Sequence, residues 1–194
     1  MSAPALHLAS SSPRRRAILT AMGLTYTHGG VDIDEARRPD ESPEAMVERL
    51  AREKAEAISR DLPVLGADTV VVLGDTVFGK PASRDDALSM LLTLSGRRHR
   101  VMTAIALHWN DRTVVERSDT QVRFRDIDPD EALAYWHSGE PAGKAGAYAI
   151  QGLGGIFVAF IEGSYSGVVG LPVFETARLL TTAGIEVLGA IDES

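Results

Sequence analysis

The first third of the chain alternates between short apolar runs and longer amphipathic stretches. The run ALHLAS at 5–10 predicts a strand, and 13–22 predicts a helix that stops at Gly23. A short strand is expected after this helix. A second helix is predicted over 43–59, because Ser42 is a favourable N-cap and proline is favoured at the first helical position.

The middle of the chain predicts two hairpins separated by a helix. Two β-rich runs within 63–81 meet at Gly74 and Asp75, a dipeptide that suits a tight turn. Residues 83–96 predict a core-facing helix with serine as N-cap, two acids in the first turn and glycine at its end. Alternating apolar residues on both sides of an Asn-Asp pair predict the second hairpin, within 99–125.

The last third begins with a helix at Asp128 and Pro129 and continues into a glycine-rich segment, 143–172, that holds one strand. A last helix is predicted over about 172–184. Two hairpins among helices favour an α/β fold with a mixed central sheet flanked by helices. The chain is long enough for one substantial core, so we expect a single domain over 1–194.

Composition narrows the classes of function. The formal net charge of -7 argues against a nucleic-acid partner, because such proteins usually carry a dominant basic face. The absence of cysteine excludes disulfides and thiolate chemistry. No apolar run has membrane-spanning length and no secretory signal pattern stands at the N-terminus, so we expect a cytoplasmic protein with no membrane partner.

Two segments of the sequence resemble known catalytic motifs but lack an essential residue of each. GDTVFGKP has P-loop spacing, yet Pro81 stands where a metal-binding hydroxyl is needed, and the segment lies in a predicted hairpin. GSYSG has Tyr165 at the place of a nucleophilic serine. The five histidines have no metal-site spacing, which favours surface or packing roles.

The stretch LASSSPRRRAIL places three arginines, Arg14, Arg15 and Arg16, in the first turn of a predicted helix. The helix dipole disfavours cations there, so a negative partner is expected. A loop with Ser10 followed by a helix N-terminus offers hydroxyl and N–H donors, and arginine suits phosphate oxygens. The alternative is a solvated basic cluster.

Four further charged residues are candidates for chemistry. Asp68 lies in apolar strand sequence, so it must be paired, protonated or metal-bound, unless Gly66 marks a bulge around a structural aspartate. Glu35 belongs to an acidic run, VDIDE, that offers oxygen ligands for Mg²⁺ or Mn²⁺ or is merely solvated. Lys54 continues an apolar helix row and either snorkels or enters a polar cavity, and Lys80 ends the hairpin. Together these residues suit a triphosphate substrate.

With these residues assembled, the sequence resembles the Maf family of nucleoside triphosphate pyrophosphatases over nearly its whole length. The blocks that carry the resemblance are LASSSPRRRAIL, VDIDE, LAREKA, LGADTVV, GKP, VMTAIAL, YAIQGLGG and GSYSGVVGLPV. The resemblance implies hydrolysis of the α–β phosphoanhydride of nucleotides with a divalent metal, Mg or Mn, and with Asp68 as proton acceptor. It also implies two lobes with a nucleotide cleft between them, and a homodimer.

Three positions separate branches of this family, and here they are Arg14, Thr69 and Gln151. They resemble the branch that acts on dTTP and UTP, or on modified pyrimidine nucleotides, rather than the branch that prefers 7-methyl-GTP. A glutamine amide offers a donor and an acceptor that match the O4 and N3–H edge shared by uracil and thymine. We therefore expect Gln151 to read the base.

The expected roles divide the site into three groups. The residues expected to hold phosphate are Ser10, Arg14 and Arg15, those expected to neutralise developing charge are Lys54 and Lys80, and those expected to anchor the metal are Glu35 and Asp68. Two other functions stay open: a nucleotide-sensing regulator of septum formation, a process to which the family is linked, and a structural protein with an arginine-rich surface.

Overall fold

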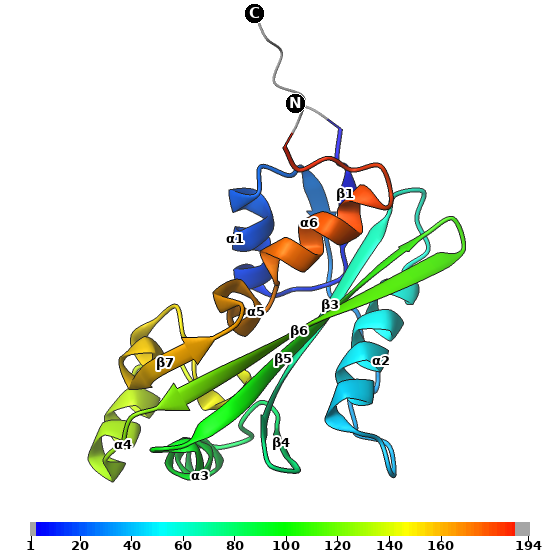
Figure 1. Ribbon diagram of the computed structural model, residues 1–194. Helices are drawn as coiled ribbons and strands as arrows, with labels where there is room; N and C mark the ends of the chain where they lie inside the picture. Colours follow the sequence, from blue (N-terminus) through cyan, green and yellow to red (C-terminus); the bar gives the residue numbers. More distant parts are fainter. Residues whose placement is uncertain (1–2, 189–194) are drawn as a thin grey trace, which may run out of the picture.

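The computed structural model describes residues 3–188 and contains a mixed sheet of seven strands (Figure 1). The strands are β1 (Leu6–Leu8), β2 (Tyr26–His28), β3 (Val64–Leu73), β4 (Thr76–Phe78), β5 (Arg98–Trp109), β6 (Arg112–Phe124) and β7 (Val158–Glu162). The α-helices are α1 (Pro13–Ala21), α2 (Pro43–Glu56), α3 (Arg84–Leu94), α4 (Pro129–His137), α5 (Tyr165–Val169) and α6 (Val173–Thr181), and the 3₁₀ turns are η1 (Ala145–Ala147) and η2 (Leu153–Phe157).

The sheet is parallel at one end and antiparallel at the other. Its order is β2-β1-β3-β5-β6-β7, with β4 paired to β3, and β1 runs parallel to both β2 and β3. All other pairs are antiparallel, including the long β5–β6 hairpin. Asn110 and Asp111 turn this hairpin with positive φ angles, as a two-residue turn of this kind requires. The predicted mixed α/β fold is therefore confirmed.

Capping side chains fix where three helices begin. Ser42 accepts a hydrogen bond from the backbone N–H of Ala45, and Ser83 accepts one from Asp86. Asp128 and Glu131 form a reciprocal capping box on α4. These contacts satisfy N–H groups that have no partner within the helix, and they set the starts predicted from the sequence.

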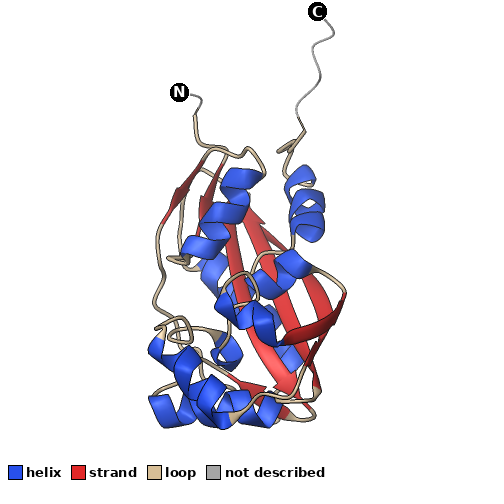
Figure 2. Ribbon diagram, turned by 90° about the vertical axis from the view of Figure 1, so that its left-hand side faces the viewer, coloured by secondary structure: helices blue, strands red, loops and turns tan. Residues whose placement is uncertain are grey.

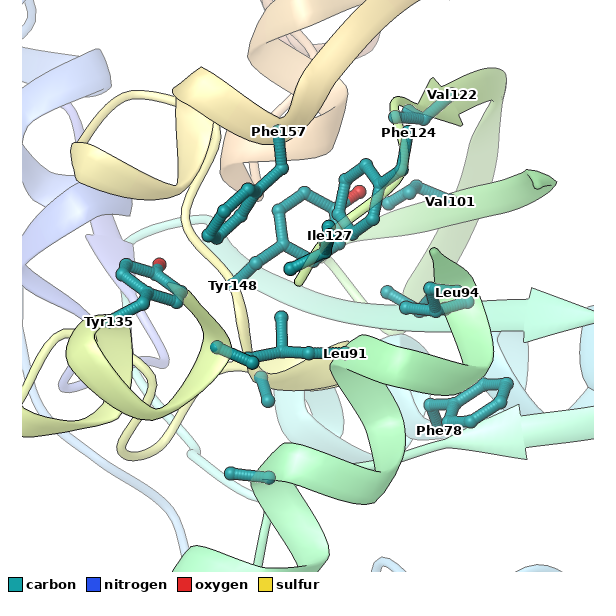
Figure 3. Close-up of a cluster of buried hydrophobic side chains, with 14 residues drawn as sticks. Phe78, Leu91, Leu94, Val101, Val122, Phe124, Ile127, Tyr135, Tyr148 and Phe157 are labelled. Carbon is teal, nitrogen blue, oxygen red and sulfur yellow. The ribbon is translucent and has the colours of Figure 1, made fainter. Parts of the chain in front are cut away.

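Two lobes lie at opposite ends of β3 and β5, each with its own buried cluster. The first lobe packs α1 and α6 against the sheet around Leu6, Leu8, Leu19, Leu65, Ala67, Ile105, Leu107, Leu171, Leu179 and Leu180. The second lobe gathers α3, α4 and aromatic side chains, among them Phe78, Phe124, Tyr135, Tyr148 and Phe157 (Figure 3). Figure 2 shows the strands continuing from one lobe into the other, with helices grouped at both ends.

Helix α2 covers the opposite face of the sheet, and its close approach corrects one expectation. The pairing of β3 with β5 is regular from Val64 to Val72, so Gly66 marks no bulge. A Cβ atom at Gly66 would instead overlap the carbonyl oxygen of Ala51 and lie 2.6 Å from the nitrogen of Ala55, both on α2. Glycine is needed here because helix backbone rests directly on strand backbone.

The glycine-rich segment holds more structure than its sequence predicts. The single expected strand is β7, but η1, η2 and the short α5 also form there. The last helix, predicted over about 172–184, is shorter and spans Val173–Thr181. Short 3₁₀ turns carry little hydrophobic periodicity, which explains why the pattern did not reveal them.

Candidate active site

A gap in one edge of the sheet creates the candidate site. On this edge β3 pairs with β1 at Val64 and Leu65 and with β4 from Val71 to Leu73. Within residues 3–188 the stretch 66–70 has no strand partner on this edge, although β5 pairs with it on the other. Asp68 and Thr69 lie in the gap and point to opposite faces, since side chains alternate along a strand. A cleft of about 610 Å³ opens here between the two lobes.

Lys54, on the α2 face of β3, lies between two carboxylates. Its Nζ atom is 2.6 Å from Oδ1 of Asp68 and 2.6 Å from Oε1 of Glu35. Lys80, on the segment that follows β4, is 3.2 Å from the other oxygen of Glu35. The Lys54 side chain therefore does not reach out to solvent. Although Lys54 lies in the apolar row of α2, its ammonium group enters a polar cavity. The structure brings together all four charged residues that the sequence singled out.

Burial and charge act in opposite directions on this cluster. The Lys54 and Asp68 side chains are only 9% and 11% exposed, so each needs the other's charge. Burial alone would raise the pKa of Glu35, but the hydrogen bond and charge of Lys54, with help from Lys80, lower it. Oδ2 of Asp68 has no hydrogen-bond partner within residues 3–188, and Asp68 lines the cleft. One carboxylate oxygen is thus anchored by Lys54, and the other makes no hydrogen bond to the described part of the chain.

Arg15 joins the serine loop to the opposite face of β3. It donates hydrogen bonds to Oγ of Ser10 at 3.2 Å, to Oγ1 of Thr69 at 3.3 Å and to the carbonyl oxygen of Gly170 at 2.8 Å. Thr69 in turn lies 2.9 Å from the hydroxyl of Thr103. No carboxylate pairs with Arg15 within residues 3–188, so its charge is directed to the cleft without a salt bridge.

The arginine cluster at the start of α1 faces the end of another helix. Nε of Arg14 donates to the carbonyl oxygen of Val169 at 3.3 Å, next to the Gly170 carbonyl that Arg15 uses. These carbonyls stand at the C-terminus of α5, where the helix dipole is negative. Part of the expected negative partner is therefore protein backbone. Arg16 turns away from the cleft, toward the imidazole of His28.

Gln151 and two residues that sequence reasoning missed also border the cleft. Gln151 is exposed, between η1 and η2. Lys144 is half-buried, and its burial together with the charge of Arg14 lowers its pKa. Tyr148 is buried and bonded to His99 at 3.0 Å. Both residues lie in the block GKAGAYAIQG, close to Gln151 in the sequence. Their proximity to Gln151 was the sequence feature that could have identified them.

The fit of a divalent metal depends on Glu35 and Asp68. Within residues 3–188 no group of three histidine, aspartate or glutamate side chains is arranged to hold a metal ion. Glu35 and Asp68 nevertheless stand together at the cleft, since both are bonded to Lys54, and each keeps a second carboxylate oxygen; Mg²⁺ is commonly bound by one or two carboxylates plus substrate phosphates. The pair fits a metal that arrives with a nucleotide. Asp32 and Asp34 are exposed and do not line the cleft.

Sequence comparisons find relatives of this protein over nearly the whole chain. A sequence model of the family described as Maf-like protein matches residues 5–183. A dTTP/UTP pyrophosphatase of Hahella chejuensis is 49% identical over 188 residues, covering 94% of each chain. Another, of Bordetella pertussis, is 50% identical over 196 residues, covering 95% of each chain.

Among solved structures, the Staphylococcus aureus Ham1 protein aligns with 61% of this chain and 71% of that chain, with 16% identity and a TM-score of 0.43. None of the helices within residues 3–188 has the length and apolar character needed to cross a membrane.

Proposed function

Because this chain belongs to the Maf-like protein family, we propose that it is a pyrophosphatase that hydrolyses dTTP and UTP to the monophosphate and pyrophosphate. The observation that carries the proposal is the arrangement of Asp68 in the sheet gap. One carboxylate oxygen is held by Lys54, and the other borders a cleft large enough for a nucleotide. Such a carboxylate is suited to accept a proton from water.

Cations on both lobes would hold the triphosphate. Arg14, Arg15 and Lys144 line the cleft, and none of them forms a salt bridge within residues 3–188. Uncompensated cations beside a cleft favour a polyanion, and the planar guanidinium donates two parallel hydrogen bonds to phosphate oxygens. Ser10 positions Arg15 and offers its own hydroxyl, which supports its proposed place in the phosphate site.

The chemical step assigned to Asp68 is proton removal. Water attacks one of the two phosphorus atoms of the α–β linkage and gives its proton to Oδ2 of Asp68. A new P–O bond forms, the bridging P–O bond breaks, and its electron pair stays with the departing phosphate group. Lys54 and Lys80 stabilise the charge that develops on the phosphate oxygens. Lys54 also orients the Asp68 carboxylate through the 2.6 Å contact.

A divalent cation, Mg²⁺ or Mn²⁺, held by Glu35 and Asp68, would supply charge neutralisation of the phosphates. For the base, Gln151 at the rim and Thr69 and Arg14 within the cleft are the proposed selecting residues. The amide of Gln151 would pair with the O4 and N3–H edge of uracil and thymine. A cytoplasmic location and a homodimer stay predictions, the latter tested by light scattering of the purified protein.

Product analysis tests the proposal. Purified protein with Mg²⁺ or Mn²⁺ is incubated with dTTP, UTP, CTP, GTP, ATP and 7-methyl-GTP, and monophosphate with pyrophosphate is resolved from diphosphate with phosphate. Monophosphate and pyrophosphate from dTTP and UTP support both reaction and branch. Preference for 7-methyl-GTP would overturn the branch. Tight nucleotide binding without turnover would favour the nucleotide-sensing regulator instead.

A further inference from the structure

The loop that carries Gln151 is held on both sides by two residues that do not line the cleft. Oε1 of Glu140 accepts a hydrogen bond from the backbone N–H of Leu153 at 3.1 Å, and its Oε2 accepts one from Gly154 at 2.9 Å. On the other side of Gln151, the backbone N–H of Ala149 donates to the hydroxyl of Tyr135 at 3.1 Å. The Tyr135 hydroxyl in turn donates to Oε2 of Glu140 at 2.6 Å.

Packing and local hydrogen bonding hold the side chains of Tyr135 and Glu140 in place. Tyr135 is 5% exposed and packs edge-to-face against Phe157 at 5.2 Å between ring centroids (Figure 3). After α4 ends, Gly139 turns the chain with φ +75, and the backbone N–H of Glu140 donates to Oγ of Ser138 at 3.2 Å. This turn places the Glu140 carboxylate against the loop that carries Gln151. Neither Glu140 nor Tyr135 borders the cleft.

Glycines let the loop run directly over this pair. A Cβ atom at Gly152 would overlap Oε1 of Glu140, and one at Gly154 would overlap the Tyr135 hydroxyl. Burial opposes ionisation of Glu140, but the hydrogen bonds from Tyr135, Gly154 and Leu153 outweigh it and lower the pKa of Glu140. An ionised carboxylate offers only acceptors, which matches the donors around it.

We propose that Glu140 and Tyr135 are positioning residues that fix the backbone on both sides of Gln151 and thereby set which base the cleft accepts. The inference rests on the proposed function, since it concerns how that same site selects its substrate. A side-chain amide discriminates between bases only when its donor and acceptor are held in place, because a free amide turns to suit either partner. Glu140 and Tyr135, together called the clamp, supply this restraint from outside the cleft.

The test compares UTP with CTP, which share sugar and phosphates and differ at the base edge that Gln151 would read. In Glu140→Gln the amide NH₂ faces an N–H donor, so one loop contact is lost. We expect the ratio of kcat/KM for UTP to that for CTP to fall about tenfold, mainly through a higher KM for UTP. This ratio is independent of how much of the preparation is folded, so a loss of stability alone does not change it.

Tyr135→Phe provides a second variant, expected to shift the ratio in the same direction. Glu131→Gln is the matched control for Glu140→Gln. Glu131 lies on α4, as Tyr135 does, but it pairs with Arg125, so the ratio for UTP and CTP should be the same in this variant as in the unmodified protein. An unchanged ratio in both clamp variants would overturn the inference.

Failure of the proposed function gives a different result. If the unmodified protein turns over neither nucleotide, the same comparison is made on binding by calorimetry. A preference for UTP that Glu140→Gln removes then supports the clamp even though the pyrophosphatase proposal has failed. Binding without any preference in the unmodified protein, or no binding at all, overturns the inference as well.

Discussion

The ammonium nitrogen of Lys54 lies 2.6 Å from Oδ1 of Asp68. Lys54 belongs to α2 and Asp68 to β3, and this helix packs against this strand. Both side chains are nearly buried, and the contact satisfies each charge in a place where neither could stand alone. The direct approach of α2 to β3 at Gly66 brings the lysine within reach. Backbone packing thus sets the geometry of the chemical group.

Removing the lysine should destabilise the protein more than removing both charges. Lys54→Met leaves the Asp68 carboxylate buried without its partner, and we expect a loss of about 3 kcal/mol in the free energy of unfolding. In the double variant Lys54→Met with Asp68→Asn, part of this loss should return, because no unpaired charge remains. Urea unfolding of the two single variants and the double variant measures the coupling. Strictly additive losses would show that the contact carries no energetic coupling.

Asp68→Asn should abolish turnover of dTTP and UTP while leaving nucleotide binding measurable. The amide keeps the shape of the side chain but cannot accept the proton from water. Turnover assays and calorimetric binding measure the two effects separately. Asp75→Asn, in the exposed β3–β4 turn, is a matched control that should retain activity. Retained turnover in Asp68→Asn would place the proton acceptor elsewhere, with Glu35 as the next candidate.

Sequence reasoning identified the charged residues but not how they would pair. An aspartate in an apolar strand and a lysine in an apolar helix row each predict an unusual environment, and the structure shows that they satisfy one another. The mixed sheet and the N-caps of α2, α3 and α4 were also predictable, since they depend on local patterns. Contacts between segments far apart in the chain left no such pattern.

The negative partner of the arginine cluster shows why the rest could not be predicted. The carbonyls that Arg14 and Arg15 use belong to Val169 and Gly170, about 155 positions later in the chain. The helix that presents them, α5, is five residues long. Its sequence, YSGVV, contains too few positions for a helical period, so neither the helix nor its contact with α1 was foreseeable.

Gly66→Ala should lower both stability and activity. The added methyl group would collide with the backbone of α2 at Ala51 and Ala55, and backbone cannot rotate away as a side chain does. We expect a loss of about 2 kcal/mol, measured by urea unfolding, and a reduced kcat because Lys54 moves with α2. Gly79→Ala serves as the stability control, because a Cβ atom there would meet no atom of residues 3–188 within 4 Å. Equal stability of both variants would contradict the close packing of α2 on β3.

Gln151→Glu should impair selection of the base more than binding of phosphate. A carboxylate lacks the donor that would meet O4 of uracil or thymine, so we expect kcat/KM for UTP to fall about tenfold. Inhibition by inorganic tripolyphosphate, which has no base, measures the phosphate site alone and should change little. A parallel loss of UTP turnover and tripolyphosphate inhibition would assign Gln151 to the phosphates instead.

The buried histidine of the second lobe should make stability depend on pH. Burial lowers the pKa of His99 from 6.5 to about 4, and its Nε2 is bonded to the Tyr148 hydroxyl at 3.0 Å. Between these two values the unfolded chain takes up a proton that the folded chain excludes, so stability falls as pH decreases through this window. At pH 5 the expected loss from this residue is about 2 kcal/mol.

His99→Gln isolates this contribution, because glutamine is neutral at every pH in the window and can keep a hydrogen bond to Tyr148. Both proteins are unfolded with urea at intervals from pH 7.5 to pH 4.5, and the difference between their unfolding free energies is plotted against pH. Carboxylates that titrate in both proteins cancel in this difference. We expect it to be flat above pH 7 and to change steadily below 6.5 in favour of the variant. A flat difference across the whole range would mean that His99 accepts a proton in the folded state as readily as in the unfolded chain.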